Sequence, residues 1–324
     1  MPILLTGATG YIGSHTAVIL LEQGYDVVIV DNLSNSSRKV LTRIEAITGK
    51  KPAFRQADIR DRAALDVIFA EFAPRAVIHF AGLKAVAEST AMPLEYYDNN
   101  VSGSITLFAA MRQAGTRHLI FSSSATVYGE PDTVPIDESA PTRPFNTYGR
   151  TKRFIEQIAE DLHASDPSWN IALLRYFNPA GAHPSGLIDE EPRGTPNNLM
   201  PFIAQVVSGL QKELLVFGND YDTPDGTGVR DYLHVMDLAR GHLHALEKLF
   251  SKPGLVIYNL GTGRGYSVLE MIHAFEAVRG QKIPYTIVDR RPGDIACCYA
   301  DPSLARKELG WQATLGIEDM ARDT

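Results

Sequence analysis

The sequence contains very little cysteine and no long apolar segment. Only two of its 324 residues are cysteines, Cys297 and Cys298, and neighbouring cysteines cannot form an ordinary unstrained disulfide. Nothing in the cysteine usage therefore indicates an oxidising compartment. The longest apolar run, from Ile295 to Ala300, has six residues, whereas a helix that spans a membrane needs about 18 or more. The N-terminus also lacks the basic and long apolar regions of a secretory signal, so we expect a soluble cytoplasmic protein.

Positive charge is also scarce. Lys and Arg total 31 against 38 Asp and Glu, which gives a formal net charge of −7, and no basic block occurs. We therefore expect no nucleic-acid partner, although a local basic pocket for an anionic small molecule stays open. The 9 histidines and 2 cysteines form no HExxH motif and no pair of CxxC motifs, so no metal site is expected either.

The composition is otherwise that of an ordinary globular protein, with 44% hydrophobic and 21% charged residues. The length suggests about two domains of roughly 150 residues each. In the first half, short apolar segments alternate with amphipathic ones, which is typical of repeated βαβ units. The expected strands are 3–5, 27–30, 53–56, 76–78, 118–121 and 171–174, and the expected helices are 11–22, 62–72, 93–114 and 146–164. We therefore predict an α/β fold with a doubly wound parallel sheet of the Rossmann type.

Beyond Phe177 the pattern changes to long segments rich in Gly, Pro and polar residues, at 178–196 and 218–228. Such segments are often functional loops. The helices expected here are 198–208, 234–249, 267–278 and 302–309, and the strands are 214–217 and 257–260, of which the second could rejoin the first sheet. The sequence thus predicts a Rossmann domain at 1–176 with a returning segment near 232–262, and a smaller mixed α/β domain formed by 177–231 and 263–324.

A glycine-rich loop joins the first strand to the first helix. Gly7, Gly10 and Gly13 have the spacing GxxGxxG, which lets backbone approach a pyrophosphate while the helix N-terminus offers N–H groups and the positive end of its dipole. Taken alone, such a loop could be only a tight turn. Asp31 ends the second strand 18 residues after Gly13, where a carboxylate would bind an adenosine ribose 2′-OH and repel a 2′-phosphate. Together these features predict a dinucleotide site that favours NAD over NADP.

A second group of residues indicates proton transfer. Tyr148 and Lys152 are four residues apart near the start of an expected helix, so their side chains share one face. Ser122 to Ser124 follow an expected strand, at the edge where open α/β sheets bind ligands. Lowering the pKa of a Tyr from about 10 to about 7 requires about 4 kcal/mol. One cation about 5 Å away, at an effective dielectric near 20, supplies roughly 3 kcal/mol, so Lys152 and the positive nicotinamide of NAD would suffice together.

Lys152 alone does not lower the pKa of Tyr148 far enough, so the estimate holds only with bound NAD. In isolation the Tyr148–Lys152 pair could equally be an aromatic–cation pair on a solvated helix face. Because a glycine loop, Asp31 and a serine-bearing strand precede it, the hypothesis of a catalytic base is the better one.

These residues resemble the extended short-chain dehydrogenase/reductase superfamily. Longer segments resemble, within it, the UDP-glucose 4-epimerase family. They are Gly7–Thr16 (GATGYIGSHT), His79–Val86 (HFAGLKAV), Pro93–Asn100 (PLEYYDNN), Phe121–Gly129 (FSSSATVYG), Arg175–Pro179 (RYFNP), Pro196–Pro201 (PNNLMP) and Gly226–Val235 (GTGVRDYLHV). The resemblance covers essentially the whole chain. Family members usually continue beyond the position of Thr324, which suggests a shortened or engineered form and affects C-terminal packing more than chemistry.

The resemblance implies reversible 4-epimerisation of UDP-glucose and UDP-galactose with a tightly held NAD that is not consumed. Tyr148 would remove the 4-OH proton, Ser124 would bind the reacting oxygen, and Lys152 would hold the nicotinamide ribose and tune Tyr148. NAD contacts are then expected at Gly7, Gly10, Tyr11, Ile12, Gly13, Asp31, Asn32, Leu33, Ser34, Asn35, Ser36, Asp58, Ile59, Phe80, Ala81, Gly82, Leu83, Lys84, Asn99, Ser122, Tyr148, Lys152 and Phe177. UDP-sugar contacts are expected at Ser124, Tyr148, Asn178, Asn198, Leu199, Phe217, Arg230, Arg291, Asp294 and Cys298.

Some of these residues allow a plainer interpretation. The guanidinium groups of Arg230 and Arg291 suit a diphosphate, but such residues also serve surface solubility. Asn178 and Asn198 could be capping or turn residues. Cys298 matches a family position that lines the sugar pocket, where its small side chain would leave room for an N-acetyl group and hence for UDP-GlcNAc and UDP-GalNAc. The alternative is a buried apolar cysteine of no consequence.

Two other functions stay open at this point. A nucleotide-sugar 4,6-dehydratase needs an extra acid and base, usually directly after the position of Ser124, where this sequence has Ala125 and Thr126. A non-catalytic dinucleotide sensor should have lost Tyr148 or Lys152, and both are present. By resemblance we also expect a homodimer, formed by the helices at 93–114 and 146–164 as a four-helix bundle.

Overall fold

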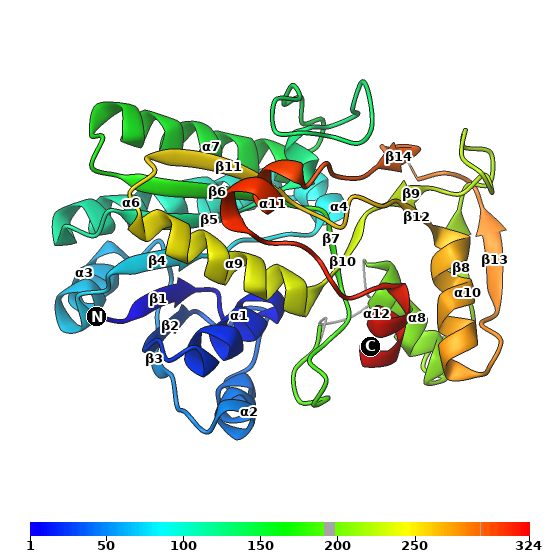
Figure 1. Ribbon diagram of the computed structural model, residues 1–324, viewed down its shortest axis with the longest axis horizontal. Helices are drawn as coiled ribbons and strands as arrows, with labels where there is room; N and C mark the ends of the chain where they lie inside the picture. Colours follow the sequence, from blue (N-terminus) through cyan, green and yellow to red (C-terminus); the bar gives the residue numbers. More distant parts are fainter. Residues whose placement is uncertain (191–197, 292) are drawn as a thin grey trace.

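The computed structural model describes residues 1–190, 198–291 and 293–324, and its centre is a seven-stranded parallel sheet (Figure 1). The strand order is β11-β6-β5-β4-β1-β2-β3, and every neighbouring pair is parallel. The strands are β1 (Ile3–Thr6), β2 (Val27–Asp31), β3 (Ala53–Gln56), β4 (Ala76–His79), β5 (His118–Ser124), β6 (Asn170–Tyr176) and β11 (Leu255–Leu260). This order confirms the predicted doubly wound sheet, and β11 does rejoin it beside β6.

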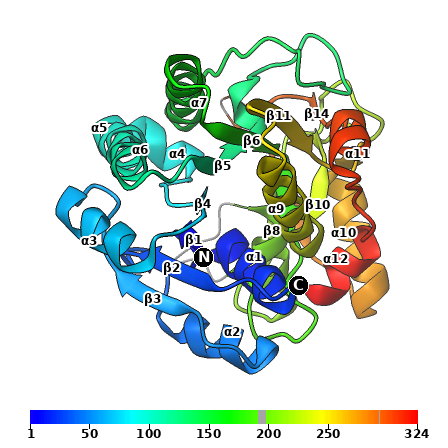
Figure 2. The same ribbon diagram turned by 60° about the vertical axis from the view of Figure 1, so that its left-hand side comes forward.

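Helices cover both faces of this sheet (Figure 2). In β1, Ile3 and Leu5 belong to one apolar cluster and Leu4 belongs to the other, because successive strand residues point to opposite faces. The first cluster includes α1 (Tyr11–Glu22), α2 (Lys39–Thr48), α9 (Val235–Phe250) and α11 (Ser303–Leu309), and the second includes α3 (Arg62–Phe72), α6 (Gly103–Ala114) and α7 (Thr147–Ser165). Burial on both faces explains why the strand sequences are continuous apolar runs.

The helix expected at 93–114 is interrupted. It consists of α5 (Pro93–Tyr96), the π-helical turn η1 (Tyr97–Ser102) and α6, and α4 (Val86–Ala91) precedes it. The prediction of one uniform α-helix was therefore wrong in the middle. The wider turn places the buried Asn100 side chain against the loop after β4, where its amide oxygen accepts from Leu83 N at 2.8 Å and its amide nitrogen donates to Leu83 O at 3.0 Å. Such turns are frequent at functional sites.

The last part of the chain forms small sheets beside the large one. They pair β7 (Asn178–Ala180) with β10 (Tyr232–His234), β8 (Leu214–Phe217) with β13 (Tyr285–Val288), and β9 (Val229–Arg230) with both β12 (Tyr266–Ser267) and β14 (Cys297–Cys298). Helices α8 (Leu199–Val207), α10 (Val268–Arg279) and α12 (Ile317–Asp323) pack around them, with a core that includes Met200, Tyr266, Phe275 and Met320. The short 3₁₀ turn η2 (Ala125–Val127) follows β5.

The sequence predicts neither a disulfide between the two cysteines nor a membrane-spanning helix. Both cysteines are free thiols. Within residues 1–190, 198–291 and 293–324, no helix has the length and apolar character needed to cross a membrane. The exact division into two domains remains a prediction from the sequence.

Candidate active site

The carboxyl ends of strands β1 to β6 lie along one edge of the sheet, because the strands are parallel and neighbouring. The glycine loop follows β1, Asp31 ends β2, and Asp58 follows β3. Phe80 to Lys84 follow β4, Ser122 to Ser124 end β5, and Phe177 follows β6. The residues expected to hold NAD are therefore gathered on the ligand-binding edge of the fold, with Asn99 joining them from η1.

The glycine loop forms a tight backbone cradle. A Cβ atom on Gly7 would lie 2.6 Å from the Cα of Ala81, and one on Gly13 would lie 2.5 Å from the Cα of Ala8, so neither position has room for a side chain. Gly10 precedes α1, and in the described part of the chain no side chain caps that helix. Its first N–H groups are thus available to an anion, which fits a pyrophosphate.

Asp31 is almost fully buried beside this cradle. Its carboxylate accepts hydrogen bonds from Thr9 N at 3.1 Å and Leu33 N at 2.8 Å. The same carboxylate accepts from the Ser36 hydroxyl at 3.3 Å, which curls the segment after β2 around it. A carboxylate held at this position fits recognition of ribose hydroxyls.

Asp58 follows the next strand, β3, and its carboxylate already accepts hydrogen bonds from neighbouring side chains. It accepts from the Arg60 guanidinium at 2.9 Å and from the Asn32 amide at 3.0 Å. The hydrogen bonds from Arg60 hold the pKa of Asp58 well below its usual value. Asp58 is therefore ionised at neutral pH and shares the site with Asn32.

The candidate NAD and UDP-sugar residues meet at Glu190. The Lys84 ammonium contacts the Glu190 carboxylate at 2.7 Å, and the Asn198 amide donates to the same carboxylate at 2.9 Å. Asn198 precedes α8 in the smaller part of the molecule, whereas Lys84 follows β4. The two predicted sets of residues are thus brought together across the sheet edge.

Ser124, Tyr148 and Lys152 form one cluster between β5 and the start of α7. Thr126 donates to Ser124 Oγ from its backbone nitrogen at 3.2 Å and from its hydroxyl at 3.0 Å. The Ser124 proton is then left for Tyr148 or for a ligand. Lys152 Nζ donates to Ser122 O at 2.6 Å and lies 5.8 Å from the centre of the Tyr148 ring.

Burial favours the neutral form of both Tyr148 and Lys152 in this cluster. Loss of hydration raises the pKa of Tyr148 to about 12, although its hydrogen bond with Ser124 acts in the opposite direction. Burial lowers the pKa of Lys152 to about 8, and the negative charge of Glu156 opposes that shift. Tyr148 therefore needs a further positive charge to become a base at neutral pH, as the arithmetic from the sequence requires.

A buried ion pair that the sequence reasoning missed supports the cluster. The Glu156 carboxylate accepts from Arg175 at 2.9 and 2.8 Å and from the Ser123 hydroxyl at 2.6 Å. Ser123 and Arg175 are paired across β5 and β6. Glu156 follows Lys152 by one helical turn on α7, and this spacing was the signal that could have revealed it.

The candidate UDP-sugar residues lie mainly on the small sheets. Their places are Asn178 in β7, Asn198 and Leu199 at the start of α8, Phe217 at the end of β8, Arg230 in β9, Arg291 and Asp294 before β14, and Cys298 in β14. Arg230 pairs with Cys298, and the Arg291 guanidinium lies 3.7 Å above the centre of the Phe217 ring. Cys298 shares an apolar cluster with Ala125, the residue after Ser124, so the candidate sugar end adjoins the catalytic cluster.

A glycine cradle, an acidic strand end and a Ser–Tyr–Lys cluster on one sheet edge define a dinucleotide-dependent enzyme of the short-chain dehydrogenase/reductase class. A family model described as GDP-mannose 4,6 dehydratase matches residues 4–324. The UDP-glucose 4-epimerase of Bacillus subtilis is 59% identical over 324 residues, which cover 100% of this chain and 96% of that protein. The chain belongs to the UDP-glucose 4-epimerase family.

Solved structures agree with this assignment. One is the UDP-glucose 4-epimerase of Stenotrophomonas maltophila with bound NAD and formylated UDP-arabinopyranose, with a TM-score of 0.98 and 55% sequence identity. The match covers 100% of this chain and 96% of that one. That of Bifidobacterium longum, in complex with NAD⁺ and UDP, has a TM-score of 0.97, 55% identity and the same coverage. The resemblance inferred from the motifs is thereby confirmed.

The structure also bears on the dehydratase alternative. Ala125 and Thr126, at the positions where a dehydratase would carry its extra acid and base, form the turn η2 directly after Ser124. Neither side chain titrates, and Thr126 is used to orient Ser124. The site therefore lacks at these two positions the groups that elimination of water needs.

Proposed function

We propose that this protein interconverts UDP-glucose and UDP-galactose by transient oxidation at C4 with a tightly bound NAD. The observation that carries the proposal is the Ser124–Tyr148–Lys152 cluster at the strand edge that also holds the glycine cradle, in a chain 59% identical to a UDP-glucose 4-epimerase. We also propose that it acts in the cytoplasm, as the sequence predicts.

The cluster assigns a role to each side chain. Bound NAD would supply a reversible hydride acceptor for C4 of the sugar. Tyr148, as the phenolate, takes the proton of the 4-hydroxyl group, and Ser124 donates a hydrogen bond to the reacting oxygen. Lys152 stabilises the phenolate through its charge and binds the nicotinamide ribose. For inversion, the pocket must let the hexose present its other face before the hydride returns.

The proposed substrate site holds the nucleotide more firmly than the sugar. Arg230 and Arg291 suit the diphosphate, because guanidinium groups form paired hydrogen bonds with phosphate oxygens. Asn178, Asn198, Leu199, Phe217 and Asp294 would complete the contacts to UDP. Cys298 and the apolar cluster around it would line the hexose pocket. Because apolar side chains form no directional hydrogen bonds with the sugar, this lining would let the hexose rotate.

The activity is tested by incubating the purified protein with UDP-galactose and no added NAD. We expect UDP-glucose to form and NAD to be released when the protein is denatured. A 4-keto-6-deoxy product would instead identify a dehydratase. Release of NAD with no turnover of either UDP-hexose would identify a non-catalytic sensor and overturn the proposal.

Cys298 provides a test of substrate range. We propose that the protein also epimerises UDP-GlcNAc and UDP-GalNAc, because the thiol of the buried Cys298 is much smaller than an aromatic side chain at that position would be. Replacing Cys298 with Tyr should abolish turnover of the N-acetylated substrates while UDP-galactose turnover falls less than about threefold. Cys298→Ala is the matched control and should retain both activities. Equal loss on the two substrate types in Cys298→Tyr would contradict this proposal.

We further propose a homodimer formed through the helices at 93–114 and 146–164. Large apolar side chains are exposed there: Leu94 is 77%, Ile105 is 49% and Phe154 is 45% exposed. Tyr97 and Phe154 are in ring contact across η1 and α7, with centroids 5.9 Å apart, so these two elements lie side by side. Contiguous apolar surfaces of this kind commonly mark subunit interfaces.

Charge placed on this surface should separate the subunits. The double variant Leu94→Glu/Phe154→Glu is expected to elute as a monomer with light-scattering detection, whereas the wild type elutes as a dimer. Val67 on α3 is 65% exposed and lies outside the surface, so Val67→Glu is the control and should remain dimeric. A monomeric wild type, or a dimeric double variant, would contradict the proposed interface.

A further inference from the structure

Asp231 is a fully buried carboxylate between β9 and β10. Its Oδ1 accepts from Thr262 N at 2.8 Å and from the Thr262 hydroxyl at 2.7 Å. Its Oδ2 accepts from Gly263 N and from Ala300 N, both at 3.1 Å. Four donors converge on this one side chain, so it joins the loop after β11 to the segment after β14.

The backbone of Asp231 reaches the proposed UDP-sugar residues directly. Its N–H donates to Cys298 O at 3.1 Å, and its carbonyl accepts from Asn178 N at 2.9 Å. The preceding residue is Arg230, which is paired with Cys298 across β9 and β14. One residue is therefore bonded to three positions of the proposed substrate site.

We propose that Asp231 is a positioning residue for UDP-sugar binding. By fixing the segments that carry Asn178, Arg230 and Cys298, it sets the distance between the end of the site that takes the diphosphate and the wall beside the hexose. Its own side chain is fully buried and acts only through these neighbours. This inference rests on the proposed function, because the three residues it positions are proposed substrate contacts.

The catalytic cluster has a separate support. Ser124, Tyr148 and Lys152 lie on β5 and α7, and the described hydrogen bonds of Asp231 reach neither element. Loss of the Asp231 carboxylate should therefore act on substrate binding and leave the proton-transfer step largely intact. A general loss of stability would not separate these two effects.

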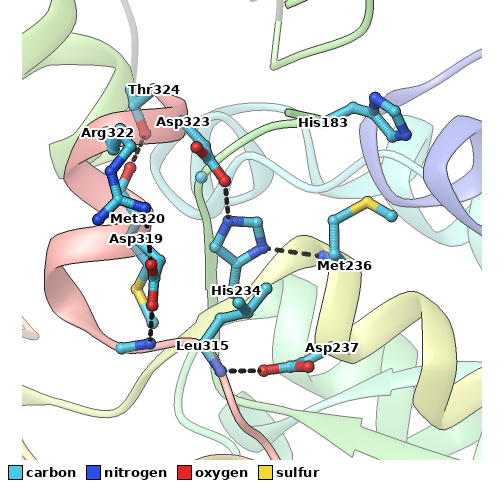
Figure 3. A network of polar contacts seen from close by, with 12 residues as sticks. His183, His234, Met236, Asp237, Leu315, Asp319, Met320, Arg322, Asp323 and Thr324 are labelled. Carbon is cyan, nitrogen blue, oxygen red and sulfur yellow. Dashed lines mark hydrogen bonds and ion pairs between the residues drawn. The ribbon is translucent and has the colours of Figure 1, made fainter. Parts of the chain in front are cut away.

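Asp237 on α9 offers a matched control. It is also a buried aspartate, 1% exposed, whose carboxylate accepts from Thr314 N at 2.7 Å and from Leu315 N at 2.8 Å. Figure 3 shows the bond to Leu315 beside His234, which holds Asp323 of α12. Asp237 thus anchors the C-terminal segment through backbone N–H donors, as Asp231 anchors its own neighbours, and it also forms an ion pair with Arg240 at 2.9 Å. Its bonds touch none of the proposed UDP-sugar residues.

The experiment compares the NAD-loaded wild type with Asp231→Asn and Asp237→Asn. In Asp231→Asn, one acceptor oxygen is replaced by an amide nitrogen that faces N–H donors, so we expect KM for UDP-galactose and Kd for UDP to rise about tenfold. We expect kcat within about threefold of wild type and unchanged NAD content. Asp237→Asn should lower the melting temperature and leave both KM and Kd unchanged.

A KM and a UDP Kd in Asp231→Asn equal to those of wild type would overturn the inference, as would equal increases in the two aspartate variants. If the wild type binds UDP but does not epimerise UDP-galactose, the proposed function fails, and the Kd for UDP still tests the positioning role.

A milder pair of variants covers the case in which Asp231→Asn does not fold. Thr262→Val removes the hydroxyl donor to Asp231 and keeps the backbone donor, whereas Thr262→Ser keeps both. We expect KM for UDP-galactose to rise about threefold in Thr262→Val and to stay at the wild-type value in Thr262→Ser. Identical KM values in the two variants would overturn the inference.

Discussion

Replacing Tyr148 with Phe is expected to lower kcat for UDP-galactose by about 10³-fold, because the variant has no group to accept the 4-hydroxyl proton. The hydroxyl group is the only part removed. Ser124 keeps its two hydrogen bonds from Thr126, and Lys152 keeps its bond to Ser122 O. KM and NAD content should change little, so the loss belongs to the chemical step.

Steady-state kinetics on the folded, NAD-loaded variant measure this effect. Tyr285→Phe makes the same chemical change on the exposed strand β13 and should retain wild-type kcat. An undiminished kcat in Tyr148→Phe would show that another group accepts the proton. The mechanism proposed for the cluster would then be wrong.

Replacing Arg175 with Met is expected to destabilise the protein by about 3 kcal/mol, because the buried Glu156 carboxylate loses its buried cation. It then keeps only the longer contact to Arg153, at 3.4 Å. Arg175 is 3% and Glu156 is 0% exposed at the side chain, and two hydrogen bonds join them. Arg175 also donates to the Tyr128 hydroxyl at 3.1 Å, so that group loses a partner too. Urea unfolding of the variant and wild type measures the difference.

Two comparisons isolate the cause of that loss. The double variant Arg175→Met/Glu156→Leu removes both charges and should recover most of the stability, since apolar pairs often replace buried ion pairs at little cost. Arg55 pairs with Glu71 at the surface, where the side chains are 43% and 41% exposed. Arg55→Met should therefore cost less than about 1 kcal/mol. Equal effects of the Arg175 and Arg55 variants would show that burial does not govern this pair.

Much of the large sheet and its helices could be predicted because their patterns are local. Continuous apolar runs such as Val27–Val30 indicate strands covered on both faces, and the spacing of Tyr148 and Lys152 indicates a shared helix face. The same reasoning overlooked α2, although Val40, Leu41, Ile44 and Ile47 are spaced for one helical face and do contact the core. The individual NAD and UDP-sugar contacts remain predictions.

The parts that escaped prediction depend on contacts between distant positions. Strands of two residues, such as β9, β12 and β14, are too short to show any periodicity. The carboxylate of Asp231 accepts from residues 31, 32 and 69 positions further along the chain, and no local pattern encodes such partners. The turn η1 depends on Asn100 fitting against the loop after β4, which is again a tertiary contact.

The position of β11 has a consequence for how the protein is made. β6 is buried along its whole length, and one of its edges pairs with β11. β11 follows the strands β7 to β10 in the chain. A growing polypeptide therefore exposes the hydrogen-bonding edge of β6 until Leu260 has left the ribosome. Open strand edges template association between chains. While residues 177–254 are being translated, the nascent chain therefore exposes a strand edge to association with other chains.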